Sequence, residues 1–221
     1  MRTVNGTTIY STVAEIIDPA HTALLVVDMQ NDECHPDGWF AQQGRSVSGI
    51  AAIVPRVRAL IDAARGAGVR VVFIQQTTLA SNQSDPPAWL YFKTRDGRTR
   101  TDYNLDGTWG QEVLSELGRR PEDVTIKKYR PSAFHLTSLD LLLRAQVVES
   151  VVICGNTTQG CVLATTLDAS FHDYFTVLVE DAVQSFSQEQ HENALRFLGS
   201  RYDLMTAEAV VRSWQNVTEA A

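Results

Sequence analysis

The sequence has little of what defines several large classes of protein. Its three cysteines, Cys34, Cys154 and Cys161, cannot complete a disulfide framework, and no C-x-x-C or Cys/His cluster indicates structural zinc. No apolar run approaches the roughly 20 residues that a membrane-spanning helix needs. Residues 1–16 also lack the apolar core of a signal peptide. We therefore expect a cytoplasmic protein of a reducing compartment, with no membrane partner.

The sequence also has fewer positively charged than negatively charged residues. The chain has 19 Lys and Arg residues against 26 Asp and Glu residues, which gives a formal net charge of -7. Nucleic-acid-binding domains usually carry a basic patch, so we expect no nucleic-acid partner. No repeat, low-complexity tract or linker divides the 221 residues, of which 44% are hydrophobic. This composition predicts one domain across residues 1–221, with a core at about residues 18–214.

What the chain does contain is an alternation of strand and helix patterns. Short apolar runs predict strands at residues 23–27, 69–74, 124–126, 147–154, 176–179 and 202–206. Apolar residues at helical spacing predict helices at residues 50–65, 110–117, 138–144, 161–171, 187–198 and 207–214. This alternation favours an α/β fold, in which a mainly parallel sheet carries helices on both faces.

Residues 77–108 break the alternation because they show no regular pattern. The segment contains several aromatic residues, among them Trp89, Tyr91 and Phe92. Irregular segments of this length inside a compact domain are often functional. We interpret residues 77–108 as a lid or as a contact between subunits, with short helical turns.

The stretch Val151–Asp173 combines a strand pattern, a turn and a cysteine. Its β-branched run ends at Gly155, small and hydroxyl residues follow, and Cys161 opens a predicted helix. The unpaired N–H groups and the dipole at a helix start favour an anion such as a thiolate. Cys161 is therefore a candidate catalytic nucleophile; the alternative is a buried structural cysteine.

Two further reactive side chains follow predicted strands. Asp28 comes directly after residues 23–27, and Lys128 comes shortly after residues 124–126. The carboxyl ends of parallel strands share one edge of the sheet, where open α/β sheets bind ligands. There Asp28 would accept the thiol proton, Lys128 would stabilise the thiolate, and Cys161 would attack a carbonyl carbon. The alternatives are a capping or turn role for Asp28 and a solvated surface charge for Lys128.

Three segments together resemble the isochorismatase-like cysteine hydrolase superfamily. They are LLVVDMQND (24–32), KKYRPSAFHLTSLDLLLRA (127–145) and VVICGNTTQGCVLATTLDASFHDYFTVLVEDA (151–182), and the resemblance covers about residues 18–214. It implies a doubly wound, six-stranded sheet in the order 3-2-1-4-5-6 and a triad of Asp28, Lys128 and Cys161. Lys128 fits the family's Lys-x-Arg motif, with Arg130 two residues on, whereas Lys127 does not.

The resemblance also implies how the substrate is held. It implies a cis peptide bond between Asn156 and Thr157, which would aim the backbone amides of Thr157 and Cys161 at the substrate oxygen as an oxyanion hole. Gln76 stands where related enzymes have an asparagine expected to bind substrate. We also predict substrate contacts for Phe134, as a wall of the site, and for Trp89, whose alternative role is packing against another subunit.

Within the superfamily, the cysteine separates amide-cleaving members from those that hydrolyse the vinyl ether isochorismate. Nicotinamidase members bind a metal through histidines after the second strand, but residues 75–95 contain no histidine, so we expect no metal and no other cofactor. The layout is closer to the ureidoacrylate, N-carbamoylsarcosine and maleamate amidohydrolases; Pro131 and Gln76 depart from the ureidoacrylate pattern.

The sequence therefore predicts a cysteine amidohydrolase that acts on a small linear amide or ureido compound. The resemblance further implies a homodimer or homotetramer. The alternatives are a vinyl-ether hydrolase of the isochorismatase type and a non-catalytic binding protein on the same fold.

Overall fold

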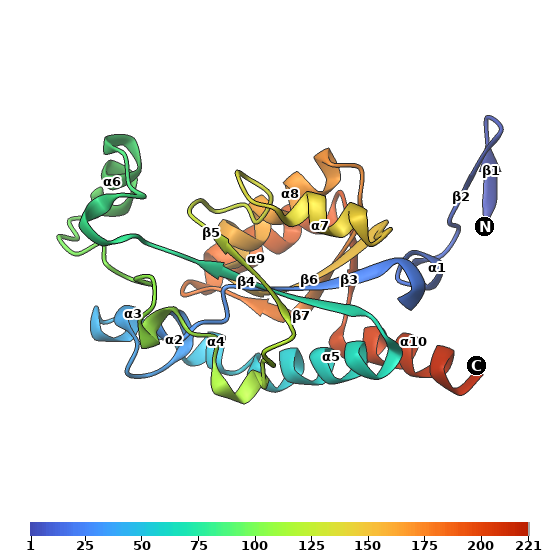
Figure 1. The fold of residues 1–221 in the computed structure, drawn as a ribbon, viewed down its shortest axis with the longest axis horizontal. Coiled ribbons are helices and arrows are strands. Elements are labelled where there is room, and N and C mark those ends of the chain that lie inside the picture. Colours follow the sequence, from blue (N-terminus) through green and yellow to red (C-terminus); the bar gives the residue numbers. More distant parts are fainter. Residues whose placement is uncertain (221) are drawn as a thin grey trace.

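The computed structural model describes residues 1–220, with side chains through residue 216. Its main feature is a six-stranded sheet in which every neighbouring pair is parallel (Figure 1). In spatial order the strands are β5 (Val124–Lys128), β4 (Arg70–Gln76), β3 (Thr22–Val27), β6 (Ser150–Asn156), β7 (Phe175–Gln184) and β8 (Asp203–Met205). Numbered from the first of these strands along the chain, the order is 3-2-1-4-5-6, which confirms the predicted fold class.

Helices cover both faces of the sheet (Figure 1). α5 (Val54–Ala67) and α10 (Ala207–Ala220) pack together on one face. The other face carries α7 (Leu139–Ala145), α8 (Leu163–Phe171) and α9 (Gln188–Gly199). No helix in the described part of the chain is both long and apolar enough to cross a membrane.

The position of β3 at the centre of the sheet explains why its sequence is continuously apolar. Leu24 and Val26 face the cluster under α5 and α10, while Leu25 and Val27 face the cluster under α7 to α9. All six residues of β3 are buried. A strand buried on both faces needs apolar residues at every position rather than at alternate ones.

The chain reverses direction at the centre of the sheet, and this places the site. From β3 it proceeds outward through β4 to β5, then returns to β6 and proceeds outward to β7 and β8. β3 and β6 are neighbours, and Val27 pairs with Gly155 at their carboxyl ends. Such a switch point leaves a crevice between the loops that leave the two strands.

The connections contain more short elements than the sequence pattern predicted. Before β3 lie a hairpin of β1 (Arg2–Val4) and β2 (Thr7–Ile9), α1 (Val13–Ile16) and the 3-10 turn η1 (Pro19–His21). Between β3 and α5 lie α2 (Asn31–Cys34), α3 (Trp39–Gln42) and α4 (Ser48–Ala51), so the predicted helix at 50–65 begins later, at Val54. Elements this short carry too few residues for a period to show in the sequence.

Residues 77–117 are partly ordered into helical turns. η2 (Ala80–Asn82) and α6 (Pro87–Thr94) lie within the segment that had no visible period. The helix predicted at 110–117 is wrong, because two 3-10 turns occupy the region, η3 (Trp109–Gln111) and η4 (Ser115–Leu117). The backbone between these two turns forms a hydrogen bond with a distant part of the chain instead of a helical one, because Leu114 N–H donates to Met29 O at 3.0 Å.

Candidate active site

Asp28, Lys128 and Cys161 meet at the carboxyl edge of the sheet. Lys128 Nζ lies 2.7 Å from Asp28 Oδ2 and donates a hydrogen bond to Cys161 Sγ at 3.2 Å. Asp28 follows β3, Lys128 ends β5, and Cys161 follows β6. The lysine therefore reaches across β4, the strand between its own and β3, and joins the carboxylate to the thiol.

The Asp28 carboxylate is held by the neighbouring strand as well as by the lysine. Its Oδ1 accepts a hydrogen bond from the backbone N–H of Gln76 at 2.9 Å. The Gln76 side chain completes the contact, because its Oε1 accepts from Lys128 Nζ at 2.9 Å. Asp28 has a φ of 49°, a left-handed conformation that Asp tolerates better than most residues. Gln76 thus belongs to the same cluster as the predicted triad.

The turn that carries Cys161 is wider than an α-helical turn. β6 ends at Asn156, the peptide bond from Asn156 to Thr157 is cis, and a π-helical turn, η5, spans Thr158–Val162 before α8 begins at Leu163. The prediction that Cys161 opens an α-helix is therefore wrong in detail, since it lies within η5. Single π turns inside or beside α-helices occur frequently at functional sites.

Hydrogen bonds fix this turn to its surroundings. Asn156 Nδ2 donates to Asp28 O at 2.6 Å, which joins the end of β6 to the end of β3. Thr158 Oγ1 lies 2.8 Å from His191 Nδ1 on α9. His191 is buried. Helical periodicity alone does not distinguish a buried histidine of this kind from an exposed one.

The electrostatics of the cluster keep Cys161 in its thiol form when no substrate is bound. Burial, the negative charge of Asp28 and a hydrogen bond to its carboxylate raise the pKa of the Cys161 thiol, and Lys128 opposes them. Burial also works against the charged form of Lys128, but its interactions with Asp28 and Cys161 outweigh burial and raise its pKa. The thiol therefore faces a carboxylate that can accept its proton and an ammonium that can hold the resulting thiolate.

Glu33 is a titratable residue of the site that the sequence analysis missed. It lies on α2, is buried, and accepts a hydrogen bond from Asn104 Nδ2 at 2.9 Å. Burial, followed by the charge of Asp28, raises the pKa of Glu33 to about 8. The only signal in the sequence was its closeness to Asp28 along the chain, in a segment that otherwise resembles a polar loop.

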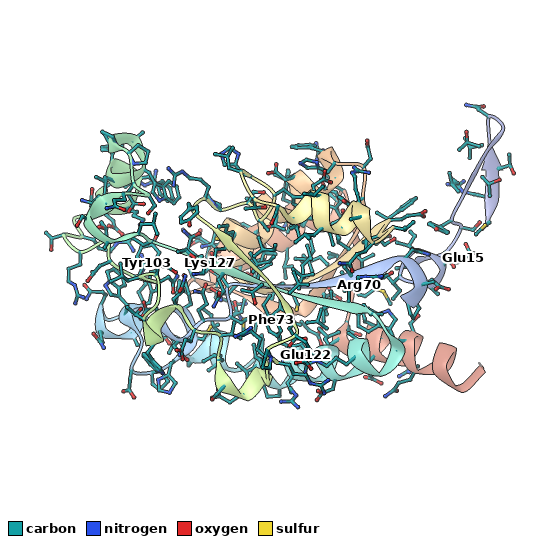
Figure 2. All side chains as sticks on the ribbon, viewed as in Figure 1. Glu15, Arg70, Phe73, Tyr103, Glu122 and Lys127 are labelled. Carbon is teal, nitrogen blue, oxygen red and sulfur yellow. The ribbon has the colours of Figure 1, made fainter. Side chains whose placement is uncertain are left out.

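The segment that contains α6 contributes Tyr103 and Asn104 to the same region. Burial, with smaller effects of Glu33 and Cys161, raises the pKa of the Tyr103 hydroxyl. Figure 2 shows Tyr103 at the end of the sheet between α6 and the α2–α3 region. Lys93 on α6 is buried, forms an ion pair with Asp85 at 2.7 Å and lies 4.6 Å from the centre of the Tyr103 ring.

Phe134 and Trp89, also singled out from the sequence, contact residues outside the triad. Phe134 is buried in the core and stacks on His172. Trp89 lies on α6, where its ring stacks on Phe92 and carries the Arg130 guanidinium at 5.0 Å. Substrate contacts for Phe134 and Trp89 stay predictions, as does the oxyanion hole of the Thr157 and Cys161 amides.

The two neighbouring lysines have different environments. Lys127 is partly exposed and pairs with Asp106 at 2.5 Å. Lys128 is fully buried against Asp28. Lys128 therefore lies beside Asp28 and Cys161, and its catalytic role stays a prediction.

Two cavities of about 410 Å³ each open beside the loop that follows Lys128. Arg130 and His135 line both of them. Tyr129, the residue next to Lys128, lines one cavity, and Ala164 of α8 lines the other. Among the residues that the structure describes, no group of three or more His, Cys, Asp or Glu side chains is placed to hold a metal ion.

Known proteins resemble the chain over most of its length. The model of the isochorismatase domain family matches residues 22–209. Ureidoacrylate amidohydrolase RutB of Caulobacter segnis is 30% identical over 190 residues, which cover 82% of this chain and 80% of that protein. A crystal structure of a cysteine hydrolase from Pseudomonas syringae pv. phaseolicola superposes with a TM-score of 0.80 at 25% identity, covering 91% of this chain and 95% of that one. For N-carbamoylsarcosine amidase from Thermoplasma acidophilum the TM-score is 0.66 at 27% identity, with coverages of 84% and 96%.

Proposed function

The chain belongs to the isochorismatase domain family of hydrolases, and from this premise we propose that it is a cysteine amidohydrolase. Its substrate is a small linear amide or ureido compound, and the bond cleaved is C–N. The observation that carries the proposal is the buried contact of Lys128 with both Asp28 and Cys161. The names of the ureidoacrylate and N-carbamoylsarcosine relatives support the substrate class.

The proposed reaction begins with proton transfer from the Cys161 thiol to Asp28. The thiolate, stabilised by Lys128, attacks the scissile carbonyl carbon, and a C–S bond forms. Backbone amides of the η5 turn stabilise the negative oxygen of the tetrahedral intermediate. The C–N bond then breaks, and the nitrogen leaves as ammonia or an amine with the proton that Asp28 took from Cys161. Water then attacks the thioester, a C–O bond forms, the C–S bond breaks, and a proton of that water returns to Cys161 through Asp28.

Lys128 is suited to this role because it is charged and fixed. It contacts Asp28, Gln76 and Cys161 at the same time. An ammonium with three partners does not have to reorganise when negative charge moves from the carboxylate to the sulfur. Such preorganised charge stabilisation is usually the largest contribution to catalysis.

The experiment that tests the proposal is an ammonia-release screen, with and without a chelator. The compounds are ureidoacrylate, carbamoyl amino acids, maleamate, nicotinamide and biuret. Cys161→Ala should lower activity on the best substrate by roughly 10⁴-fold or more, with an unchanged thermal unfolding midpoint. Full activity in Cys161→Ala would contradict a nucleophilic cysteine. If the protein releases no ammonia from these compounds but releases pyruvate from isochorismate, a vinyl-ether hydrolase would be favoured.

A further inference from the structure

The Gln30 side chain binds the end of β4 at the point where β3 no longer accompanies that strand. β3 ends at Val27, whose partner is Ile74, whereas β4 continues to Gln76. Beyond this pair, Asp28 N–H still donates to Ile74 O at 3.0 Å. The next bond of a parallel ladder would run from Gln76 N–H to Asp28 O. A buried backbone group that loses its ladder bond needs another partner.

The chain leaves the ladder before this bond forms, because Asp28 has a left-handed backbone with a φ of 49°. The Asp28 carbonyl oxygen accepts instead from Asn156 Nδ2 at 2.6 Å. Two side-chain oxygens share the Gln76 N–H, Asp28 Oδ1 at 2.9 Å and Gln30 Oε1 at 2.8 Å. Gln30 Nε2 also donates to Gln76 O at 3.0 Å. The Gln30 amide thus takes the place of a peptide group in a neighbouring strand.

Gln76, which the Gln30 amide holds, contacts two members of the proposed triad. Its backbone N–H donates to the Asp28 carboxylate, and its Oε1 accepts from Lys128 Nζ at 2.9 Å. Gln30 is fully buried, and its Nε2 also donates to Gln111 O at 2.8 Å. Both amide protons and the amide oxygen of Gln30 are therefore bonded. A buried polar network that is satisfied in this way is rigid.

We propose that Gln30 is a positioning residue for the proposed triad, which acts through Gln76. This inference rests on the proposed function. With Gln30 in place, Gln76 directs its N–H at the Asp28 carboxylate and gives the Lys128 ammonium a neutral acceptor. The third N–H of the ammonium is then directed at Cys161 Sγ, 3.2 Å away. Without Gln30, the end of β4 shifts, the carboxylate loses its N–H donor and holds the ammonium more closely, and the thiolate loses its counter-charge.

The first measurement is the rate at which iodoacetamide alkylates Cys161 in the absence of substrate, followed by peptide mass spectrometry over a pH series. Gln30→Met keeps the length of the side chain but removes the amide, and it should slow alkylation by roughly tenfold at pH 8. Gln30→Asn keeps the amide on a chain one methylene shorter and should slow alkylation in the same direction. If Gln30→Met does not fold, the milder Gln30→Asn decides the result.

Gln75→Met is the matched control. Gln75 is also buried, precedes Gln76 on β4, and donates to the same Gln111 oxygen at 2.9 Å. Both methionine variants therefore lose a hydrogen bond to Gln111, but Gln75→Met leaves the contact between Gln30 and Gln76 intact. Both should lower the thermal unfolding midpoint, whereas Gln75→Met should keep the alkylation rate of the wild type.

The second measurement is steady-state hydrolysis of the best amide substrate. Because a positioned charge acts on the transition state, Gln30→Met should lower kcat by roughly 10- to 100-fold with little change in KM. Gln75→Met should keep the kcat of the wild type. A loss that appears in KM alone would show that Gln30 affects substrate binding and does not position the triad.

The remaining outcomes separate this inference from the proposed function. Alkylation at the wild-type rate in the Gln30 variants would overturn the inference. Equal slowing in Gln75→Met would also overturn it, because it would indicate a general loosening of the end of β4. A wild-type protein that hydrolyses none of the compounds would overturn the proposed function, and the alkylation rates would still show whether Gln30 positions Lys128 against Cys161.

Discussion

At the scale of single residues, the burial of Lys128 between Asp28 and Cys161 is the feature that most constrains the chemistry. A lysine without solvent must find its partners inside the protein, and here they are a carboxylate and a thiol. The carboxylate raises the pKa of Cys161 and the ammonium lowers it. The two residues therefore have opposite effects on the thiol and can be separated by mutation.

We predict that Asp28→Asn makes Cys161 more reactive while turnover is lost. Removing the negative charge lowers the pKa of the thiol, so iodoacetamide should alkylate Cys161 roughly tenfold faster at pH 8. Lys128→Met should slow alkylation, because the thiolate loses its counter-charge. Alkylation rates over a pH series measure both effects. A slower reaction in Asp28→Asn would show that Asp28 does not act on the thiol through its charge.

The sequence identified the residues of the predicted triad but not those that surround them. Asp28 and Cys161 stood out because each follows an apolar run, and Lys128 stood out through its motif. Glu33, Asn104 and His191 did not, since a polar residue in a loop or helix has the same appearance whether it is buried or exposed. Burial of such residues depends on segments that are distant in the chain, as the contact of Glu33 with Asn104 shows.

At the scale of elements, the pairing of β6 with β3 depends on Gly155. Its φ is 115°, and a Cβ atom there would meet the backbone of Val27. We predict that Gly155→Ala lowers the free energy of unfolding by more than about 3 kcal/mol, measured by chemical denaturation. Gly66→Ala on α5 is the control, because nothing lies near its added Cβ. It should be neutral or stabilising by up to about 1 kcal/mol. Equal effects of the two changes would contradict this account.

The segment around α6 depends on the buried ion pair between Asp85 and Lys93. Burial lowers the pKa of Lys93, and the Asp85 carboxylate offsets part of this cost. Asp85→Asn leaves the lysine without its counter-charge and should destabilise the segment by about 3–5 kcal/mol. Hydrogen exchange of residues 77–108 should increase accordingly.

Asp62→Asn provides the control for this ion pair. It breaks the exposed pair with Arg58 and should leave the stability nearly unchanged. Unchanged exchange of residues 77–108 in Asp85→Asn would show that the pair does not hold the segment.

The elements that the sequence predicted best are those buried on both faces. β3, β4 and β6 appear as apolar runs. β3 begins one residue earlier than predicted, whereas β4 and β6 begin one and three residues later and each ends two residues later. The sequence did not separate η5 from α8, and it predicted short helical turns in residues 77–108 without the bounds of α6. η5 continues directly into α8, so its residues follow the same helical spacing. α6 is short and of mixed composition, so its apolar residues show no clear helical spacing.

At the scale of the whole molecule, Glu33 links the site to stability. Its pKa is about 8 in the folded chain, whereas an unfolded glutamate titrates near 4.3. Between these values the folded state holds a proton that the unfolded state has released, so this group lowers stability as pH rises.

We predict that Glu33→Gln is more stable than wild type at pH 8.5, by on the order of a few kcal/mol. At pH 4.5 the two proteins should be nearly equal, since both then carry an uncharged side chain. Thermal or urea unfolding at the two pH values measures the difference. Glu112→Gln, which changes an exposed glutamate, is the control. A difference that is the same at both pH values would indicate that titration of Glu33 is not its source.

The contact between Lys128 and Asp28 also determines how the reaction responds to the rest of this acidic chain. In the proposed acylation, a thiolate beside an ammonium replaces a carboxylate beside the same ammonium. The negative charge moves from the Asp28 carboxylate to the Cys161 sulfur, but the total charge of Asp28, Lys128 and Cys161 does not change. A protein with a formal net charge of -7 therefore forms its nucleophile without adding to its own negative charge. Dissolved salt screens charges over about 8–10 Å in water and so acts on the arrival of a charged substrate rather than on this internal step. We therefore expect the rate of the internal proton transfer to depend little on surface charge and on ionic strength.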